Sequence, residues 1–561
     1  MFYKPSHIDA SKKKQLLQRF WNKDPSLWSK DAKVQESIGN RLGWLDCLDR
    51  IKPTLKELTD FATKLRSNGV KRVVWMGMGG SSLCAQVLVD IFGVQDGYPE
   101  LCVLDTTDPM VVQRYSDELS SKKTFFVVAS KSGTTLETRA HLAFFWQKMV
   151  ELYGQNNAGD FFAAITDSGT TLDKFASEHK FFHTFRGESG VGGRYSALSV
   201  FGLVAAAIIG IPLDQAVSIA EATIAQCRVL DWDQNPAARL ATFLSEYGVQ
   251  NKDKLTLFFD APVRSLGLWL EQLVAESTGK ETVGLVPIIG ETTGIPGFYG
   301  AERMFVYFRM MDTPVEDSLD GFMDELRRAD FPVYMLQLQN PMDVFGMFFL
   351  WEMAVALTGH FLGINPFDEP NVLSAKQKTS EVLSEYVKNG KFNMEFWVDP
   401  TSQFNFRTSE MLAASMKGLS RALRDTFLVL PSWGYMGFLA YLPYDSEVDE
   451  IISEMRHFIR QERGFATTFG YGPRYLHSTG QVHKGGPMSS AFIVFTRQKE
   501  AEYPVVPGFD ASFWHIQFAQ AVGDFQALSS VGKRVIHIHL PADYRMGLRS
   551  FSKVFLRAAR L

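Results

Sequence analysis

Cysteine is scarce in this sequence: the chain of 561 residues contains four, and none of them lies in the CxxC spacing of a redox or metal-binding pair. This scarcity argues against a disulfide scaffold and against a thiolate zinc site, and it is typical of a protein kept in a reducing compartment. The four residues are Cys47, Cys84, Cys102 and Cys227.

An excess of positive charge is also missing, because 58 lysines and arginines are balanced by 62 aspartates and glutamates, which gives a formal net charge of −4. General nucleic-acid binders are usually basic, so we expect no nucleic-acid partner. The net charge is still compatible with a small anionic substrate, provided that the binding site is locally positive. Hydrophobic residues reach 46%, which argues against disorder and supports several domains with large cores.

Two apolar stretches could be mistaken for membrane spans. Leu198–Leu213 is short, and Phe345–Ile364 includes Glu352 and His360. We expect both to be buried core helices and therefore expect no membrane partner. No apolar stretch follows the charges of the first residues, so we expect no secretory signal and a cytoplasmic location.

Short apolar runs alternate with helix-like stretches through much of the chain. Arg72–Met76, Leu101–Leu104, Thr124–Ala129 and Phe161–Ile165 are four such runs, and a second series begins at Lys254. This alternation predicts an α/β fold with parallel strands and helices on both faces of the sheets. We expect a helical N-terminal arm (1–60), two α/β domains (61–235 and 236–389) and an α/β C-terminal extension of the second domain (390–561).

The C-terminal region continues the alternation, and no low-complexity linker precedes it. It could therefore also be a third module. Glu447–Gln461 and Phe513–Gln526 have helical spacing. The strands expected here are Leu428–Leu430, Phe438–Leu442, Ala491–Phe495 and Arg534–His539.

A glycine-rich segment, Gly77-Met78-Gly79-Gly80-Ser81-Ser82, directly follows the first predicted strand and opens a helix. Glycines let the backbone approach a ligand closely, and the free N–H groups at a helix start can hold an anion. The motif alone fits three structures equally well: a sugar-phosphate site, a dinucleotide site in which Asp105 binds the ribose, and a plain tight turn.

Hydroxyl groups are concentrated after the third predicted strand, in Ser130-Lys131-Ser132-Gly133-Thr134-Thr135. A helix cap needs one or two such residues, whereas four hydroxyls and an ammonium fit a phosphate cradle. The two loops follow strands of one parallel sheet, so we expect them to hold a small phosphate ester together. The candidate phosphate-binding residues are Gly79, Gly80, Ser81, Ser130, Lys131, Ser132 and Thr135.

A third motif, Gly192-Gly193-Arg194-Tyr195-Ser196, precedes the helix expected from Leu198, and its arginine could also be a surface ion-pair residue. The three motifs, in this order, resemble those of the glucose-6-phosphate isomerase family. The resemblance implies two flavodoxin-like αβα sugar-isomerase (SIS) domains, a phosphate site at the first two motifs and an active-site role for Arg194. Over the whole chain the resemblance is strongest to the isomerase half of bifunctional transaldolase/glucose-6-phosphate isomerase proteins.

Two later segments extend the resemblance. Glu276-Ser277-Thr278-Gly279-Lys280 looks like the family's ESxGK element, which implies that Glu276 is the catalytic base. Pro366-Phe367-Asp368-Glu369-Pro370, followed by Lys376, resembles the PFDQ element and its active-site lysine. The family usually has glutamine at the position of Glu369.

The family's ring-opening histidine lies between these two elements, where this chain has no histidine before His360. The segment Leu476-His477-Ser478-Thr479-Gly480-Gln481 resembles the missing element but comes later in the chain. We take His477 as its equivalent and His483 as a nearby rival. The alternating residues His537 and His539 are expected to be packing residues.

The position of His477 also bears on the assembly. Family members receive this histidine from the second subunit of a homodimer. We expect residues 390–561 to stand in for that subunit and to deliver His477 to their own chain, so that a monomer could be active. An ordinary homodimer is the alternative.

The resemblance implies an aldose–ketose isomerase of glycolysis and gluconeogenesis that interconverts glucose 6-phosphate and fructose 6-phosphate without a cofactor or metal. His477 and Lys376 suit ring opening, Glu276 suits proton transfer through a cis-enediol, and Arg194 suits stabilisation of the intermediate. One alternative is a phosphosugar-binding regulatory SIS protein without chemistry, which has no use for this set of residues. A dinucleotide-dependent oxidoreductase is the other.

Overall fold

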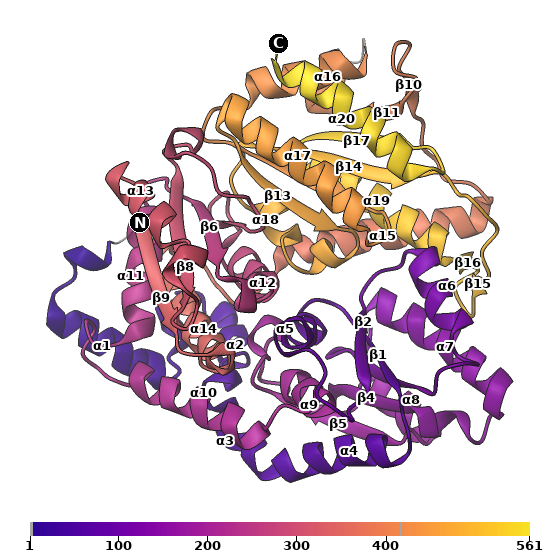
Figure 1. Cartoon of the computed structure of the whole chain (residues 1–561), viewed down its shortest axis with the longest axis horizontal. Coiled ribbons are helices and arrows are strands. Elements are labelled where there is room, and N and C mark those ends of the chain that lie inside the picture. Colours follow the sequence, from indigo (N-terminus) through magenta and orange to yellow (C-terminus); the bar gives the residue numbers. More distant parts are fainter. Residues whose placement is uncertain (1–3, 416–417, 561) are drawn as a thin grey trace.

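The computed structural model describes residues 4–415 and 418–560. In this part of the chain, helices surround three larger sheets, which lie in three lobes (Figure 1). The first lobe, in purple, contains a five-stranded parallel sheet in the order β2-β1-β3-β4-β5. Its strands are β1 (Arg72–Gly77), β2 (Glu100–Leu104), β3 (Thr124–Ala129), β4 (Phe162–Asp167) and β5 (His183–Gly187).

The second and third sheets lie in the pink and orange lobes of Figure 1. The second is parallel, in the order β7-β6-β8-β9. Its strands are β6 (Lys254–Phe259), β7 (Val286–Ile288), β8 (Arg303–Met310) and β9 (Val333–Leu338). The third contains β12 (Tyr435–Ala440), β13 (Ala466–Tyr471), β14 (Ser490–Arg497) and β17 (Arg534–Leu540), with β11 (Asn405–Thr408) and β10 (Trp397–Val398) added antiparallel at one edge.

The three sheets share one strand order. In each sheet the first four parallel strands, numbered as they appear in the chain, lie in the order 2-1-3-4. With helices between the strands, this is the flavodoxin-like arrangement that the resemblance implied. The C-terminal strands form a sheet of their own and do not extend the second one. The domain boundaries drawn from the sequence remain predictions.

Helices connect the strands and cover both faces of the sheets, as the βαβ pattern requires. The first lobe contains α5 (Leu83–Phe92), α6 (Pro109–Asp117), α7 (Leu136–Tyr153), α8 (Thr171–Glu178) and α9 (Val200–Ile209), and α10 (Leu213–Cys227) and α11 (Pro236–Gly248) lead to the second. The second contains α12 (Leu266–Thr278), α13 (Asp320–Arg328) and α14 (Val344–Phe361), and α15 (Pro370–Asn389) packs against the third lobe. The third contains α16 (Leu419–Val429), α17 (Ser446–Arg463), α18 (Gly480–Gly485), α19 (Phe513–Ser530) and α20 (Tyr544–Arg560), with a small ribbon of β15 (Val505–Val506) and β16 (Ala511–Ser512).

Strand β1 divides two hydrophobic cores, because successive side chains of a strand point to opposite faces. Val73 and Trp75 pack in the core that joins the first sheet to the N-terminal arm and the second sheet. Val74 and Met76 pack on the other face, in a core that includes residues of α15 and α19. The first sheet is therefore packed against the other two lobes and the arm.

The N-terminal arm is helical, as predicted, and runs along the first two lobes (Figure 1). Phe20 is fully buried, and the indole of Trp28 donates a hydrogen bond to the carbonyl of Ala356 in α14 at 2.8 Å. The arm is thus part of the core and is anchored to the second lobe. Its helices are α1 (Ala10–Trp21), α2 (Ala32–Gly39), α3 (Cys47–Ile51) and α4 (Leu55–Ser67).

The expected core helix Phe345–Ile364 is found as α14. Among the described residues, Pro341–Phe361 is the one helical segment long and apolar enough to cross a membrane, and nearly all of it is buried inside the protein. Its burial confirms the prediction of a core helix. The other apolar stretch is shorter than predicted, because its helix ends at Ile209 where Gly210 adopts a left-handed conformation.

One strand predicted in the C-terminal region is wrong. Leu428–Leu430 lies at the end of α16, where Leu428 is 63% exposed and Phe427 and Leu430 are buried. This burial pattern follows the helical period, which three consecutive apolar residues cannot reveal. The other three strands predicted in this region correspond to β12, β14 and β17.

The difference between these positions is measurable. We expect Phe438→Ala, in the core of the third lobe, to destabilise the protein by ~3–5 kcal/mol because it opens a cavity at a fully buried position. We expect Leu428→Ala to change stability by no more than ~0.5 kcal/mol because the side chain faces solvent. Urea unfolding of both variants measures this, and a large loss for Leu428→Ala would contradict its exposed position on α16.

Candidate active site

The sequence motifs converge on one cavity of about 540 Å³. Ten of the eleven predicted site residues line it, and Ser130 does not. A larger groove of about 880 Å³ lies between the amino ends of the second and third sheets and contains none of these residues. The predicted residues on the wall of the smaller cavity are Gly79, Gly80, Ser81, Lys131, Ser132, Thr135, Arg194, Glu276, Lys376 and His477.

The glycine loop after β1 packs so closely against its neighbours that side chains would not fit. Gly79 has a φ of 52°, and a Cβ atom there would lie 2.8 Å from the carbonyl oxygen of His477. A Cβ atom on Gly80 would lie 2.1 Å from the carbonyl oxygen of Gly193. The glycines therefore allow the first loop to contact both the arginine loop and the histidine segment.

The hydroxyl-rich loop after β3 forms the adjacent wall. Ser132 and Thr135 line the cavity, whereas buried Ser130 donates a hydrogen bond to Thr135 Oγ1 at 3.2 Å. Lys131 Nζ lies 2.6 Å from Asp167 Oδ2 and donates to the carbonyl of Glu188 at 2.6 Å. Asp167 thus holds the ammonium at the edge of the cavity. Ser130 supports Thr135 and is not part of the wall.

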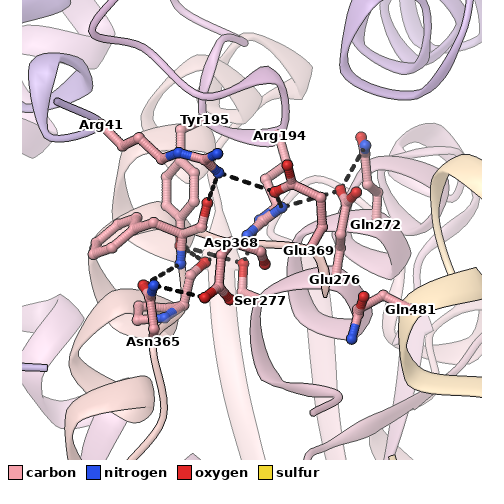
Figure 2. Close-up of polar contacts among 12 residues, drawn as sticks. Arg41, Arg194, Tyr195, Gln272, Glu276, Ser277, Asn365, Asp368, Glu369 and Gln481 are labelled. Carbon is pink, nitrogen blue, oxygen red and sulfur yellow. Dashed lines mark hydrogen bonds and ion pairs between the residues drawn. The ribbon is translucent and has the colours of Figure 1, made fainter. Parts of the chain in front are cut away.

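Arg194 is buried and joins three segments of the chain (Figure 2). Its Nε donates to Ser277 Oγ at 2.9 Å, and its Nη2 donates to the carbonyls of Pro366 and Asp368 at 2.8 and 2.9 Å. Its Nη1 lies 3.1 Å from Glu369 Oε2 and 3.4 Å from Glu276 Oε2. Burial excludes the alternative of a surface ion pair, and the guanidinium lies on the cavity wall.

Glu276 lies in the last turn of α12 with its carboxylate on the cavity wall. Gln272, one turn earlier on the same helix, donates a hydrogen bond to Glu276 Oε2 at 3.0 Å. Burial raises the pKa of Glu276, although Arg194 opposes this effect. A carboxylate with a raised pKa is a stronger base, which suits reversible proton transfer near neutral pH.

His477 is held against a buried carboxylate. Its Nε2 lies 3.0 Å from Glu137 Oε1 in α7, and Gln520 donates to the same oxygen at 2.7 Å. Burial opposes ionisation of Glu137, but the charge of His477 and its hydrogen bond lower the pKa of Glu137 to about 2. Because an ionised carboxylate only accepts hydrogen bonds, Nε2 donates, and neutral His477 keeps its lone pair on Nδ1.

The rival His483 lies outside this cavity wall. It is buried, its Nδ1 lies 3.2 Å from the hydroxyl of Tyr435, and burial lowers its pKa well below the usual value. His537 is also buried, and its Nε2 lies 2.8 Å from Thr496 Oγ1, as expected of a packing residue. Of the four histidines weighed in the sequence, His477 is the one that reaches the motif residues.

Two contacts fix the histidine segment in the first and second lobes. Arg474 forms an ion pair with Asp105, with Nε 2.6 Å from Oδ2. Gln481 donates a hydrogen bond to the carbonyl of Gly279 in the Glu276 segment at 2.9 Å. Asp105, which a dinucleotide site would need for the ribose, is fully buried in this contact, and this counts against the dinucleotide alternative.

Several cavity residues were missed by the sequence analysis. Gln272 could have been found, because it lies four positions before Glu276 on one helix face. Glu137, which contacts His477 from outside this cavity wall, lies two residues after the hydroxyl-rich loop. Asn40 and Arg41 come from the N-terminal arm, and nothing in their local sequence indicated a site.

The chain is similar in sequence to known sugar-phosphate isomerases. A family model described as phosphoglucose isomerase matches residues 45–300. A glucose-6-phosphate isomerase of Prochlorococcus marinus (strain MIT 9215) is 24% identical over 481 residues, which cover 76% of this chain and 86% of the relative. The same enzyme of Staphylococcus epidermidis is 28% identical over 388 residues, covering 61% of this chain and 87% of the relative.

Over residues 45–300 the chain is similar to the glucose-6-phosphate isomerase family. A crystal structure of a glucose-6-phosphate isomerase from Chlamydia trachomatis has the same fold, with a TM-score of 0.54 at 17% identity over 68% of this chain and 86% of that chain. The family match ends at residue 300. Lys376 and His477 lie beyond it, so their assignment to the site depends on the geometry.

The close approach of the first loop yields a test. We expect Gly80→Ala to weaken the binding of a sugar phosphate about tenfold or more, because the new methyl group would push the loop away from Gly193. Gly190→Ala is the matched control, since its Cβ atom would meet only ordinary contacts. Isothermal titration of both variants measures the effect, and equal affinities would contradict the loop packing.

Proposed function

We propose that this protein interconverts glucose 6-phosphate and fructose 6-phosphate by ring opening and a cis-enediol proton transfer. The observation that carries the proposal is the placement of one buried carboxylate, Glu276, in the same cavity as the phosphate loops, Lys376 and His477. A phosphate held at one end of the cavity would orient the reacting carbons at the other.

The residues divide the chemistry among them. Glu276 would take the proton from C2 and return it to C1, and its raised pKa makes the protonated form a competent donor. His477, with Nδ1 as the acceptor and Glu137 behind it, would work with Lys376 in ring opening. Arg194 would stabilise negative charge on the enediolate oxygens.

No step in this scheme calls for a metal or cofactor. We expect purified protein to convert fructose 6-phosphate to glucose 6-phosphate in a coupled assay, at the same rate with and without EDTA. Failure to isomerise would leave the regulatory alternative, a phosphosugar-binding SIS protein without chemistry. Activity that disappears in EDTA and returns with a divalent ion would overturn the metal-free scheme.

The role of Glu276 is tested by Glu276→Gln. We expect the rate to fall by ~10²–10⁴-fold, because the change removes the base, while affinity for a competitive sugar-phosphate inhibitor is kept. Glu271→Gln is the matched control: Glu271 is buried on the same helix, and burial raises its pKa to about 8, so glutamine mimics its protonated form. Wild-type turnover in Glu276→Gln would show that the base is misassigned.

We also propose that His477 acts in the site of its own chain, with residues 390–561 standing in for a second subunit. The support is that His477 and Glu276 line one cavity of a single chain and that Arg474 and Gln481 anchor the histidine segment there. A monomer would then be complete. The cytoplasmic location and the likeness to a bifunctional protein remain predictions.

Mixing of inactive variants tests the assembly. We expect co-expressed Glu276→Gln and His477→Ala chains to remain inactive, because each chain lacks one residue of its own site. If subunits shared sites, a mixed dimer would contain one intact site and regain a substantial fraction of activity. Such complementation would overturn the single-chain arrangement.

A further inference from the structure

The N-terminal arm brings a second guanidinium to the cavity. Arg41 lies just after α2, where a β-bridge between Leu42 and Val191 attaches the arm to the loop that precedes Arg194. The side chain donates to the carbonyl of Phe367 and lines the cavity. Arg41 is thus fixed at both its backbone and its side chain.

Glu369 lies between two cations (Figure 2). Its Oε2 is 3.0 Å from Arg41 Nη1 and 3.1 Å from Arg194 Nη1. Burial opposes its ionisation, but Arg194 and Arg41 hold its pKa below the usual value. Glu369 is therefore a carboxylate in the cavity, where the sequence resemblance would have placed a neutral amide.

One guanidinium nitrogen of Arg194 contacts the carboxylates of both Glu369 and Glu276. Arg194 Nη1 contacts Glu369 Oε2 at 3.1 Å and Glu276 Oε2 at 3.4 Å. The order of contacts is Arg41, Glu369, Arg194, Glu276, with two positive and two negative charges. Any change in the charge of Glu369 alters how strongly Arg194 stabilises the ionised form of Glu276.

We infer that Glu369 and Arg41 are a positioning pair for Glu276: Glu369 shares Arg194 with the base, and Arg41 balances the charge that Glu369 adds. The inference rests on the proposed role of Glu276. Neither member of the pair needs to touch the reacting carbons.

Other groups also face the two carboxylates. Gln272 donates to Glu276 from its own helix, and the charge of His477 favours the ionised form of Glu276. Lys280 is held by Asp368 beside Glu369, and burial lowers its pKa to about 8. The other titratable groups on the described cavity wall are Lys131, Asp167, Lys376 and Tyr195. The substitutions below leave all of them unchanged.

The test is a double-substitution cycle read as the dependence of kcat on pH. Glu369→Gln should move the acidic limb to lower pH by roughly half to one unit, because Arg194 then serves Glu276 alone. Arg41→Gln should move it to higher pH, because Glu369 keeps its charge without its partner. The double variant should return close to the wild type, and Arg41→Lys should stay close to it.

Lys52→Gln is the matched control. Lys52 forms a similarly exposed ion pair with Glu221, which also joins the arm to the body but lies outside the cavity. If Arg41 had a purely structural role, Arg41→Gln would lower kcat at every pH without moving its acidic limb. Lys52→Gln would then have the same effect.

The outcomes separate the two proposals. A wild-type protein that does not isomerise fructose 6-phosphate overturns the proposed function, and with it the role of Glu276. The wild type could instead be active while the acidic limb of kcat stays in place in both single variants, or moves in the same direction in both. That result would overturn the positioning pair alone.

Discussion

The buried guanidinium of Arg194 is the interaction on which the site depends. Taking an arginine out of water is costly unless its hydrogen bonds are replaced. Here the second lobe replaces them, through Ser277, two backbone carbonyls and the carboxylates of Glu276 and Glu369. The need to satisfy one buried cation therefore brings the base, the arginine loop and the segment before α15 into one place.

A second buried ion pair performs the same task for the third lobe. Asp105 is fully buried at the end of the first sheet and is paired with Arg474, three residues before His477. A buried carboxylate left without its partner would be strongly destabilising, so the pair fixes how the two lobes meet. The position of His477 relative to the phosphate loops follows from this contact.

Two buried glutamates of the site have opposite properties for clear physical reasons. Glu137 accepts hydrogen bonds from His477 and Gln520, and its pKa falls to about 2, so it orients the histidine as a fixed anion. Burial dominates at Glu276, and its pKa rises. Because their surroundings separate their pKa values, the two carboxyl groups suit different roles in acid–base chemistry.

The sequence by itself determined the α/β class, the motif loops and ten residues of the cavity wall. Local patterns report such features, because strand–helix alternation and loop composition are properties of short segments. Leu428–Leu430 was misread because three apolar residues do not distinguish a strand from a helix end. The tertiary structure decided the separate third sheet, the support role of Ser130 and the meeting of His477 with Glu137. It also decided the reach of Arg41 to Glu369, a contact across more than 300 positions of the chain, since only packing brings such distant residues together.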